Sequence, residues 1–120
     1  MARIVVVDDS LFPAKKIQAF LEGEGHAVSG IGLNGNEAFD LYRKFKPDLI
    51  TLDIIMPEKS GKESLKDILD FDADARSILD PSVIADCMDI GAKGFIEKPL
   101  KFSNPEFCST FAESINAALH

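Results

Sequence analysis

Apolar residues along the chain fall into short continuous runs that alternate with stretches of helical periodicity. The run at residues 4–7 is β-branched throughout, and the run at residues 49–52 leads into Asp53, four positions before Pro57. Apolar runs of this length, bounded by turn residues, are typical of strands buried on both faces. Because proline cannot continue such a strand, we expect Asp53 at the carboxyl end of a central strand.

The remaining pattern completes a strand–helix alternation that is repeated along the whole chain. It predicts strands at residues 3–7, 27–31, 49–53, 77–79 and 93–97, and helices at about 10–24, 37–45, 62–70, 82–90 and 106–119. Ser10 is expected to cap the first helix, with Leu11 on its inward face. The alternation predicts one α/β domain over residues 1–120, with a doubly wound five-stranded parallel sheet in the order 2-1-3-4-5.

Charged residues follow three of these strands at the same predicted edge. In this order the first and third strands are neighbours, so Asp8, Asp9 and Asp53 should meet at their carboxyl ends. Lys98 follows the fifth strand and faces the same edge. Each motif alone is weak, because an acidic residue at a strand end is often only a turn cap. Their conjunction in one small domain favours a functional site.

Three carboxylates in one crevice repel one another, and a hard divalent cation such as Mg²⁺ would neutralise them. Asp53 is then the best placed nucleophile, and its attack on a phosphoryl donor would give an aspartyl phosphate. Lys98 would supply a second positive charge to the phosphoryl group. The arrangement therefore predicts metal-assisted phosphoryl transfer.

Composition narrows the classes of partner and location. The 120 residues are 46% hydrophobic, which allows a packed core, and the net charge is -7. A charge of this sign argues against nucleic acid or an anionic membrane as a direct partner. Cys87 and Cys108 lack metal-type spacing and are interpreted as reduced thiols. The N-terminus does not have the pattern of a signal peptide, so we expect a cytoplasmic protein.

Three stretches of the chain together resemble the receiver domain of two-component response regulators, and the single-domain chemotaxis regulators in particular. The stretches are Val5-Val6-Val7-Asp8-Asp9-Ser10, Pro47-Asp48-Leu49-Ile50-Thr51-Leu52-Asp53-Ile54-Ile55-Met56-Pro57 and Gly91-Ala92-Lys93-Gly94-Phe95-Ile96-Glu97-Lys98-Pro99, with Gly61 between the last two. The resemblance covers nearly the whole chain.

The resemblance implies a phosphorelay function for the acidic residues. Asp53 would accept a phosphoryl group from a sensor histidine kinase, and Lys98 would contact that group. The Mg²⁺ ligands would be Asp8, Asp9, Asp53 and the backbone carbonyl of Ile55. Such a receiver assists its own phosphorylation but is not otherwise an enzyme. It passes the signal to a downstream protein target or a phosphotransfer protein.

The region of the fourth strand departs from the family pattern. Members of the family end this strand in a Ser or Thr that binds the phosphoryl group, whereas here residues 77–79 run directly into Asp80 and Pro81. We interpret this as a short deletion, after which Ser77 and Ser82 are candidates for the hydroxyl only through a local rearrangement. Phe95 stands where the family keeps its switch aromatic. We expect disorder or an unusual path around residues 72–85, or a swapped dimer in place of a monomer.

Three functional hypotheses remain open at this point. The first is a stand-alone receiver that signals through a protein partner. The second is a degenerate receiver that binds a partner without phosphate-driven switching, which the altered fourth strand favours. The third is a metal-dependent phosphatase with an aspartyl-phosphate intermediate. That class normally needs a second acid two residues after the nucleophile, where this chain has Ile55.

Overall fold

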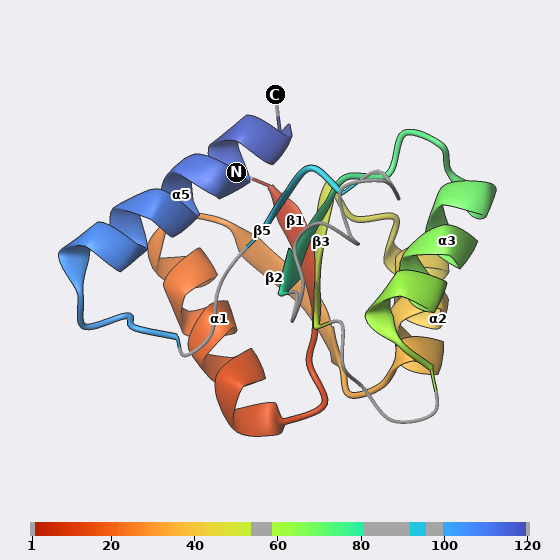
Figure 1. Ribbon diagram of the computed structural model, residues 1–120, viewed down its shortest axis with the longest axis horizontal. Helices are drawn as coiled ribbons and strands as arrows, with labels where there is room; N and C mark the ends of the chain where they lie inside the picture. The colour runs from red at the N-terminus through yellow and green to blue at the C-terminus, as the bar shows by residue number, and fades with distance from the viewer. Residues whose placement is uncertain (1, 54–58, 81–91, 96–99, 120) are drawn as a thin grey trace.

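The computed structural model describes residues 2–53, 59–80, 92–95 and 100–119 (Figure 1). Its elements are β1 (Arg3–Val7), α1 (Leu11–Gly23), β2 (Ala27–Gly32), α2 (Gly35–Phe45), β3 (Leu49–Asp53), α3 (Gly61–Phe71), β4 (Ser77–Asp80), β5 (Gly94–Phe95) and α5 (Pro105–Leu119). The helix predicted at residues 82–90 lies outside the described residues.

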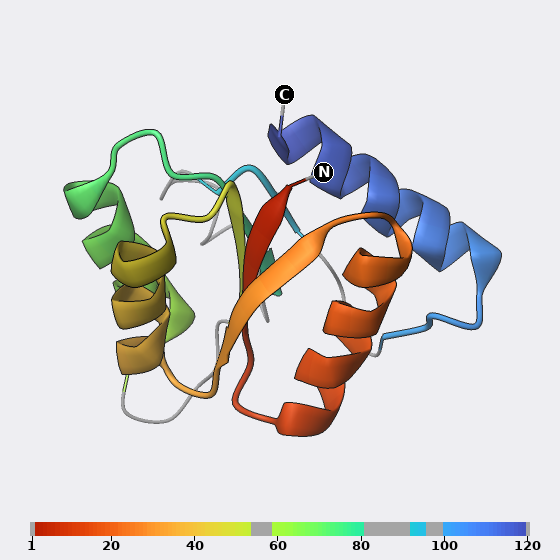
Figure 2. The same ribbon diagram turned by 180° about the vertical axis from the view of Figure 1, so that it is seen from behind.

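The strands form one parallel sheet in the order β2-β1-β3-β4-β5, in which β5 is a two-residue strand paired with β4. Helices α1 and α5 cover one face of the sheet, and α2 and α3 cover the other, as both views show (Figures 1 and 2). The predicted α/β class with a parallel sheet is therefore confirmed. The first and third strands are neighbours, as the predicted order requires.

Side chains from the two faces of the sheet enter two separate cores. On β1, Ile4 and Val6 pack with residues of α1 and α5, whereas Val5 and Val7 pack with residues of α2 and α3. All four side chains are at most 2% exposed. A strand covered on both faces must be apolar at every position, which explains the continuous runs in the sequence.

Aromatic rings fill the core between α1 and α5. The ring of Phe20 stacks on those of Phe102 and Phe111, with centroids 5.1 and 5.2 Å apart, and Phe107 meets Phe102 edge-on. Because Phe102 belongs to the segment before α5, this stacking fixes the approach of the chain to that helix. Offset and edge-on ring pairs contribute about 0.5–1.5 kcal/mol each beyond the area they bury.

The start of α1 differs from the expectation. Ser10 is the N-cap residue, but its side chain makes no capping hydrogen bond. Its backbone N–H donates to Oδ1 of Asp8 at 3.0 Å, which sets the turn before the helix. The third helical residue, Pro13, has no N–H and so offers no partner to a capping side chain. Leu11 is 52% exposed and does not face the core, because the first turn of α1 lies beyond the end of the sheet (Figure 1).

Strand β4 is more regular than expected. A turn at residues 73–74 leads into a four-residue strand, one residue longer than predicted, which pairs with β3 without a bulge. The expected disorder or unusual path is therefore not observed at residues 72–80. Residues 81–85 lie outside the described residues.

A close contact joins α2 to α3 and to the two residues that lead into α3. The Ser64 hydroxyl lies 2.9 Å from the carbonyl oxygen of Gly35 and 3.0 Å from that of Ser60. Lys59 forms an ion pair with Asp67 of α3. A Cβ atom on Gly35 would lie 2.6 Å from Ser64 Oγ and would collide with the Lys59 backbone. Position 35 therefore requires glycine for reasons of space.

We expect Gly35→Ala to lower the free energy of unfolding by about 2 kcal/mol, because the overpacked contact must open. Urea denaturation followed by circular dichroism measures this change. Gly23→Ala is the matched control, since no atom outside the neighbouring residues and the helix's own backbone lies within 4 Å of the added methyl group. Within a helix that control should stabilise by about 0.5–1 kcal/mol. Equal effects of the two substitutions would contradict the steric explanation.

Tyr42, the single tyrosine of the chain, joins α2 to the turn after α3. Its side chain is 3% exposed, and its hydroxyl donates a hydrogen bond to Oδ2 of Asp72 at 2.8 Å. Burial raises the pKa of Tyr42 above its usual range, and the hydrogen bond to Asp72 raises it further. The folded protein therefore holds this proton more tightly than the unfolded chain does.

We expect Tyr42→Phe to lower the free energy of unfolding by about 1 kcal/mol at pH 7. A raised pKa in the folded state stabilises fully below the unfolded pKa of about 10, and that contribution is lost as the pH rises further. The difference between the natural protein and the variant should therefore shrink above about pH 10. Urea titrations of both proteins at a series of pH values measure this difference in the free energy of unfolding. A difference that does not change with pH would contradict a raised pKa of Tyr42.

Candidate functional site

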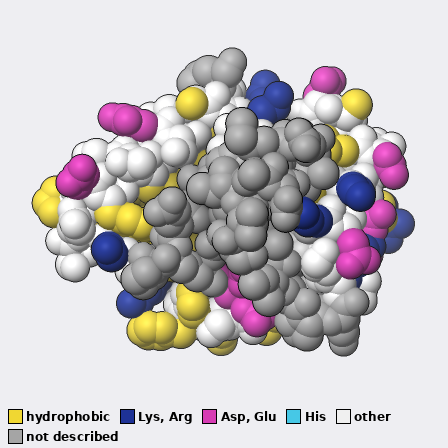
Figure 3. Space-filling view, viewed as in Figure 1, with side chains coloured by type: hydrophobic (Ala, Val, Ile, Leu, Met, Phe, Trp, Pro, Cys, Tyr) yellow, Lys and Arg dark blue, Asp and Glu magenta, His cyan; other side chains and the backbone are white. Residues whose placement is uncertain are grey.

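Three carboxylates converge at the carboxyl edge of the sheet. One ligand oxygen from each of Asp8, Asp9 and Asp53 can be chosen so that all three lie within 4.8 Å of one another. Asp8 is 1% exposed and Asp53 is 9% exposed, whereas Asp9 is exposed. In Figure 3, acidic side chains reach the surface at the lower centre, near the end of β1 in the same view. The structure therefore brings together the three acids that the sequence placed at this edge.

Strand register explains why these carboxylates meet. Val7 of β1 is in register with Leu52 of β3, so the next residue of each strand is an aspartate at the same level of the sheet. The backbone N–H of Asp8 donates to the carbonyl of Gly32 at 3.0 Å, which continues the pairing with β2. The hydrogen bond from the Ser10 N–H then orients the Asp8 carboxylate. The buried strands thus position the acids before any ligand binds.

The electrostatics of this cluster favour a cation. Two full charges about 5 Å apart repel by roughly 3 kcal/mol at an effective dielectric of 20. Three carboxylates offer only hard oxygen ligands, which is the donor set that Mg²⁺ prefers, and one exposed member leaves room for water and a phosphoryl oxygen. The donor set therefore fits Mg²⁺. The same edge could hold a carboxylate nucleophile next to the metal.

The other predicted site residues are described only in part. Ile55 and Lys98 lie outside the described residues, so their roles remain predictions. Phe95 belongs to β5, where its Cα is in register with Leu79 of β4. The role of its side chain as a switch also remains a prediction.

The register of β4 corrects the expectation about the missing hydroxyl. Ser77 is in register with Ile50, at the beginning of β4 and three residues before the level of Asp53. Its hydroxyl is buried and makes no hydrogen bond within the described part of the chain. Ser77 is therefore not at the site, and the second candidate, Ser82, lies outside the described residues. The residue in register with Asp53 is Asp80.

The sequence pattern predicts Asp80 only as the end of the fourth strand. A signal was present in the pattern, because Leu79-Asp80 before a proline repeats the sequence Leu52-Asp53 that leads to Pro57. Without the register of the two strands, however, nothing in the sequence aligns the two acids.

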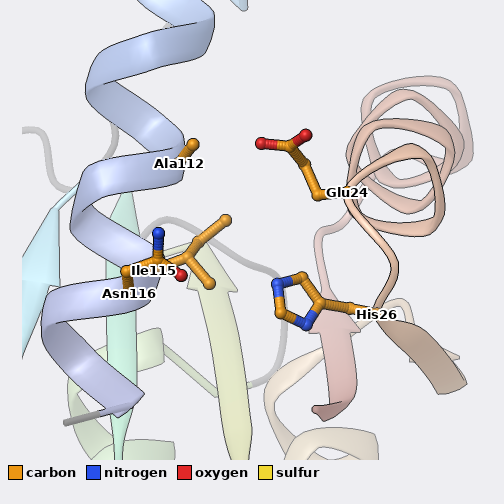
Figure 4. A pocket seen from close by; sticks show the side chains of 5 residues that line it. All are labelled: Glu24, His26, Ala112, Ile115 and Asn116. Carbon is orange, nitrogen blue, oxygen red and sulfur yellow. The ribbon is translucent and has the colours of Figure 1, made fainter. Parts of the chain in front are cut away.

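A pocket at the opposite edge of the sheet is separate from this cluster. Glu24 and His26, before β2, face Ala112, Ile115 and Asn116 of α5 across it (Figure 4). Nδ1 of His26 accepts a hydrogen bond from the backbone N–H of Ala2 at 3.1 Å. The histidine thus joins the beginnings of β1 and β2, which is a structural role.

Across the described ranges, none of the helices combines the length and apolar character needed to cross a membrane.

Comparison with known proteins identifies relatives along most of the chain. The profile of the family described as "Response regulator receiver domain" matches residues 4–105. Protein CcdB of Bacillus subtilis is 41% identical over 106 residues, which cover 84% of this chain and 88% of that protein. The chemotaxis protein CheY of Thermotoga maritima is 34% identical over 104 residues, which cover 82% of this chain and 87% of that one.

Solved structures give the same relationship. The chain is similar to a chain in the crystal structure of the CheX-CheY-BeF3-Mg complex from Borrelia burgdorferi. The TM-score is 0.88 and the identity 30%, with 98% of this chain and 89% of that chain covered. The relationship therefore extends over nearly the whole fold, including the edge that carries the acids.

We expect Mg²⁺ to stabilise the folded protein by about 2.7 kcal/mol at a concentration 100 times its dissociation constant. Asp8→Asn should abolish most of this effect. In metal-free buffer, Asp53→Asn should raise the free energy of unfolding by about 1 kcal/mol, because it removes a repelling charge. Thermal unfolding with and without Mg²⁺ measures both effects.

Asp70→Asn is the control for net charge, because Asp70 is exposed on the last turns of α3. It should leave the response to Mg²⁺ unchanged. A response that survives Asp8→Asn, or that Asp70→Asn also removes, would contradict a metal site at the acidic cluster.

Proposed function

This chain belongs to the response regulator receiver domain family, and we propose that it accepts a phosphoryl group on Asp53 in a Mg²⁺-dependent reaction. The donor is the phosphohistidine of a sensor histidine kinase, and a protein partner responds to the phosphorylated form. The observation that carries the proposal is the convergence of Asp8, Asp9 and Asp53, with ligand oxygens within 4.8 Å of one another.

The proposed step uses Asp53 as the nucleophile. A carboxylate oxygen of Asp53 attacks phosphorus while the bond between phosphorus and the donor nitrogen breaks. The leaving imidazole nitrogen keeps the electron pair of that bond and takes up a proton from solvent. Bound Mg²⁺ would neutralise negative charge on the phosphoryl oxygens.

The environments of the three acids support this division of roles. Asp53 ends a buried strand that holds it rigidly at the edge of the sheet. Asp8 is oriented by the Ser10 N–H, as suits a metal ligand. Asp9 is exposed and can complete the ligand set from the solvent side. By resemblance to the family motif, the backbone carbonyl of Ile55 would be a further ligand and Lys98 would contact the phosphoryl group.

The partners we propose are proteins. The net charge of -7 disfavours nucleic acid and anionic membranes. The solved relative from Borrelia burgdorferi is a complex of CheY with CheX, which supports signalling through a protein contact. Output would then pass to a downstream target or a phosphotransfer protein that recognises the region of β5 and α5.

A degenerate receiver that binds a partner without phosphate-driven switching is the second candidate. The observation that favours it is the register of Asp80 with Asp53, at the level where members of this family carry a hydroxyl. Phosphorylation of Asp53 could still occur in such a protein, because the acceptor and the metal ligands lie on other strands. Absence of phosphorylation would favour this candidate, because a receiver that gains no phosphoryl group cannot switch by phosphate.

We expect the intact mass to increase by one phosphoryl group after incubation with Mg²⁺ and a small phosphodonor such as acetyl phosphate. The gain should be absent with Asp53→Asn and absent when EDTA removes the metal. Asp70→Asn should behave like the natural protein. A folded protein that binds Mg²⁺ but gains no mass would support the degenerate receiver instead.

A further inference from the structure

The two strands β3 and β4 end at the same level of the sheet, and each ends in an aspartate. Leu52 is in register with Leu79, and Asp53 is in register with Asp80. Neighbouring strands lie about 4.8 Å apart, so the Cα atoms of these two acids are separated by a single strand spacing.

The alternation of β3 also places Asp53 on the face that α1 and α5 cover. Leu49 belongs to the core beneath these two helices, whereas Ile50 and Leu52 belong to the other core. Since residues two apart in a strand share a face, Asp53 falls on the face of Leu49. Asp8 follows Ile4 and Val6 on that same face of β1. Three adjacent strands therefore carry an aspartate at one level.

We propose that Asp80 determines how strongly this site retains a phosphoryl group, and that it favours the unphosphorylated, cation-bound form. The inference rests on the function proposed above. Phosphorylation of Asp53 adds negative charge, which a carboxylate at the adjacent register position opposes. The same carboxylate attracts a divalent cation. Asp80 thus acts on the two forms of the site in opposite directions.

This arrangement predicts a signal that persists only while the donor is supplied. The phosphorylated form is disfavoured relative to a receiver with an uncharged side chain at this position, so its steady-state fraction is low and falls quickly when the donor is removed. Replacing the charge with an isosteric amide isolates the electrostatic effect from the shape of the side chain.

The test uses beryllofluoride, an anionic analogue of the phosphoryl group, because its binding is an equilibrium. In the presence of Mg²⁺, Asp80→Asn should bind beryllofluoride about tenfold more tightly than the natural protein, the factor that loss of one opposing charge produces. Mg²⁺ alone should bind the variant no more tightly than the natural protein. Asp70→Asn removes an equal charge from α3 and should change neither constant.

Phosphorylation by acetyl phosphate separates failure of this inference from failure of the proposed function. Equal beryllofluoride affinity and equal phosphoryl gain in the natural protein and Asp80→Asn would overturn the role of Asp80 alone. No phosphoryl gain in either protein, with both folded, would overturn the proposed function and this inference together. If Asp80→Asn does not fold, Asp80→Ala removes the same charge without introducing a hydrogen-bonding group and is expected to give the same result.

Discussion

The parallel register between β1 and β3 is the constraint on which the rest of this structure depends. Both strands are buried on both faces, so their alignment is fixed by the packing of apolar side chains into the two cores. Once Val7 is aligned with Leu52, Asp8 and Asp53 must lie side by side. The candidate site is thus a direct consequence of core packing, because no flexible loop decides the relative position of its two buried acids.

Other contacts maintain this alignment from outside the sheet. The Ser10 N–H orients Asp8 at the beginning of α1, and the contact of Gly35 with Ser64 fixes the segment that enters α3. At the far edge, the bond from Ala2 to His26 joins the beginnings of β1 and β2. These bonds are individually worth only about 1 kcal/mol. Together they restrain both ends of β1 and the entry into α3.

Most of the fold could be predicted from the sequence, because the spacing of apolar residues indicates which faces of each strand or helix are buried. The continuous runs at residues 4–7 and 49–52 indicate strands covered on both faces, and their positions before Asp8 and Asp53 indicate the edge of the sheet where the acids meet. The sequence does not give the register of β4, because its apolar run is too short to indicate where the strand begins and ends. The length of β4 and the alignment of Asp80 with Asp53 depend on pairing with β3, which is a tertiary contact.

The start of α1 is the remaining difference. Ser10 has the residue type of an N-cap, but its side chain makes no capping hydrogen bond. The third residue of the helix is Pro13, which has no N–H, so one usual partner of a capping side chain is missing. The carboxylate of Asp8 accepts the backbone N–H of Ser10 and sets the turn. The exposure of Leu11 follows from the same turn, since α1 starts beyond the sheet.

The sheet also separates two cores that share no side chain, one beneath α1 and α5 and the other beneath α2 and α3. Residues without common packing partners contribute to stability independently. Mutations accepted in one layer therefore need no compensating change in the other. The surface of α1 and α5 can therefore be altered toward a new partner without repacking α2 and α3.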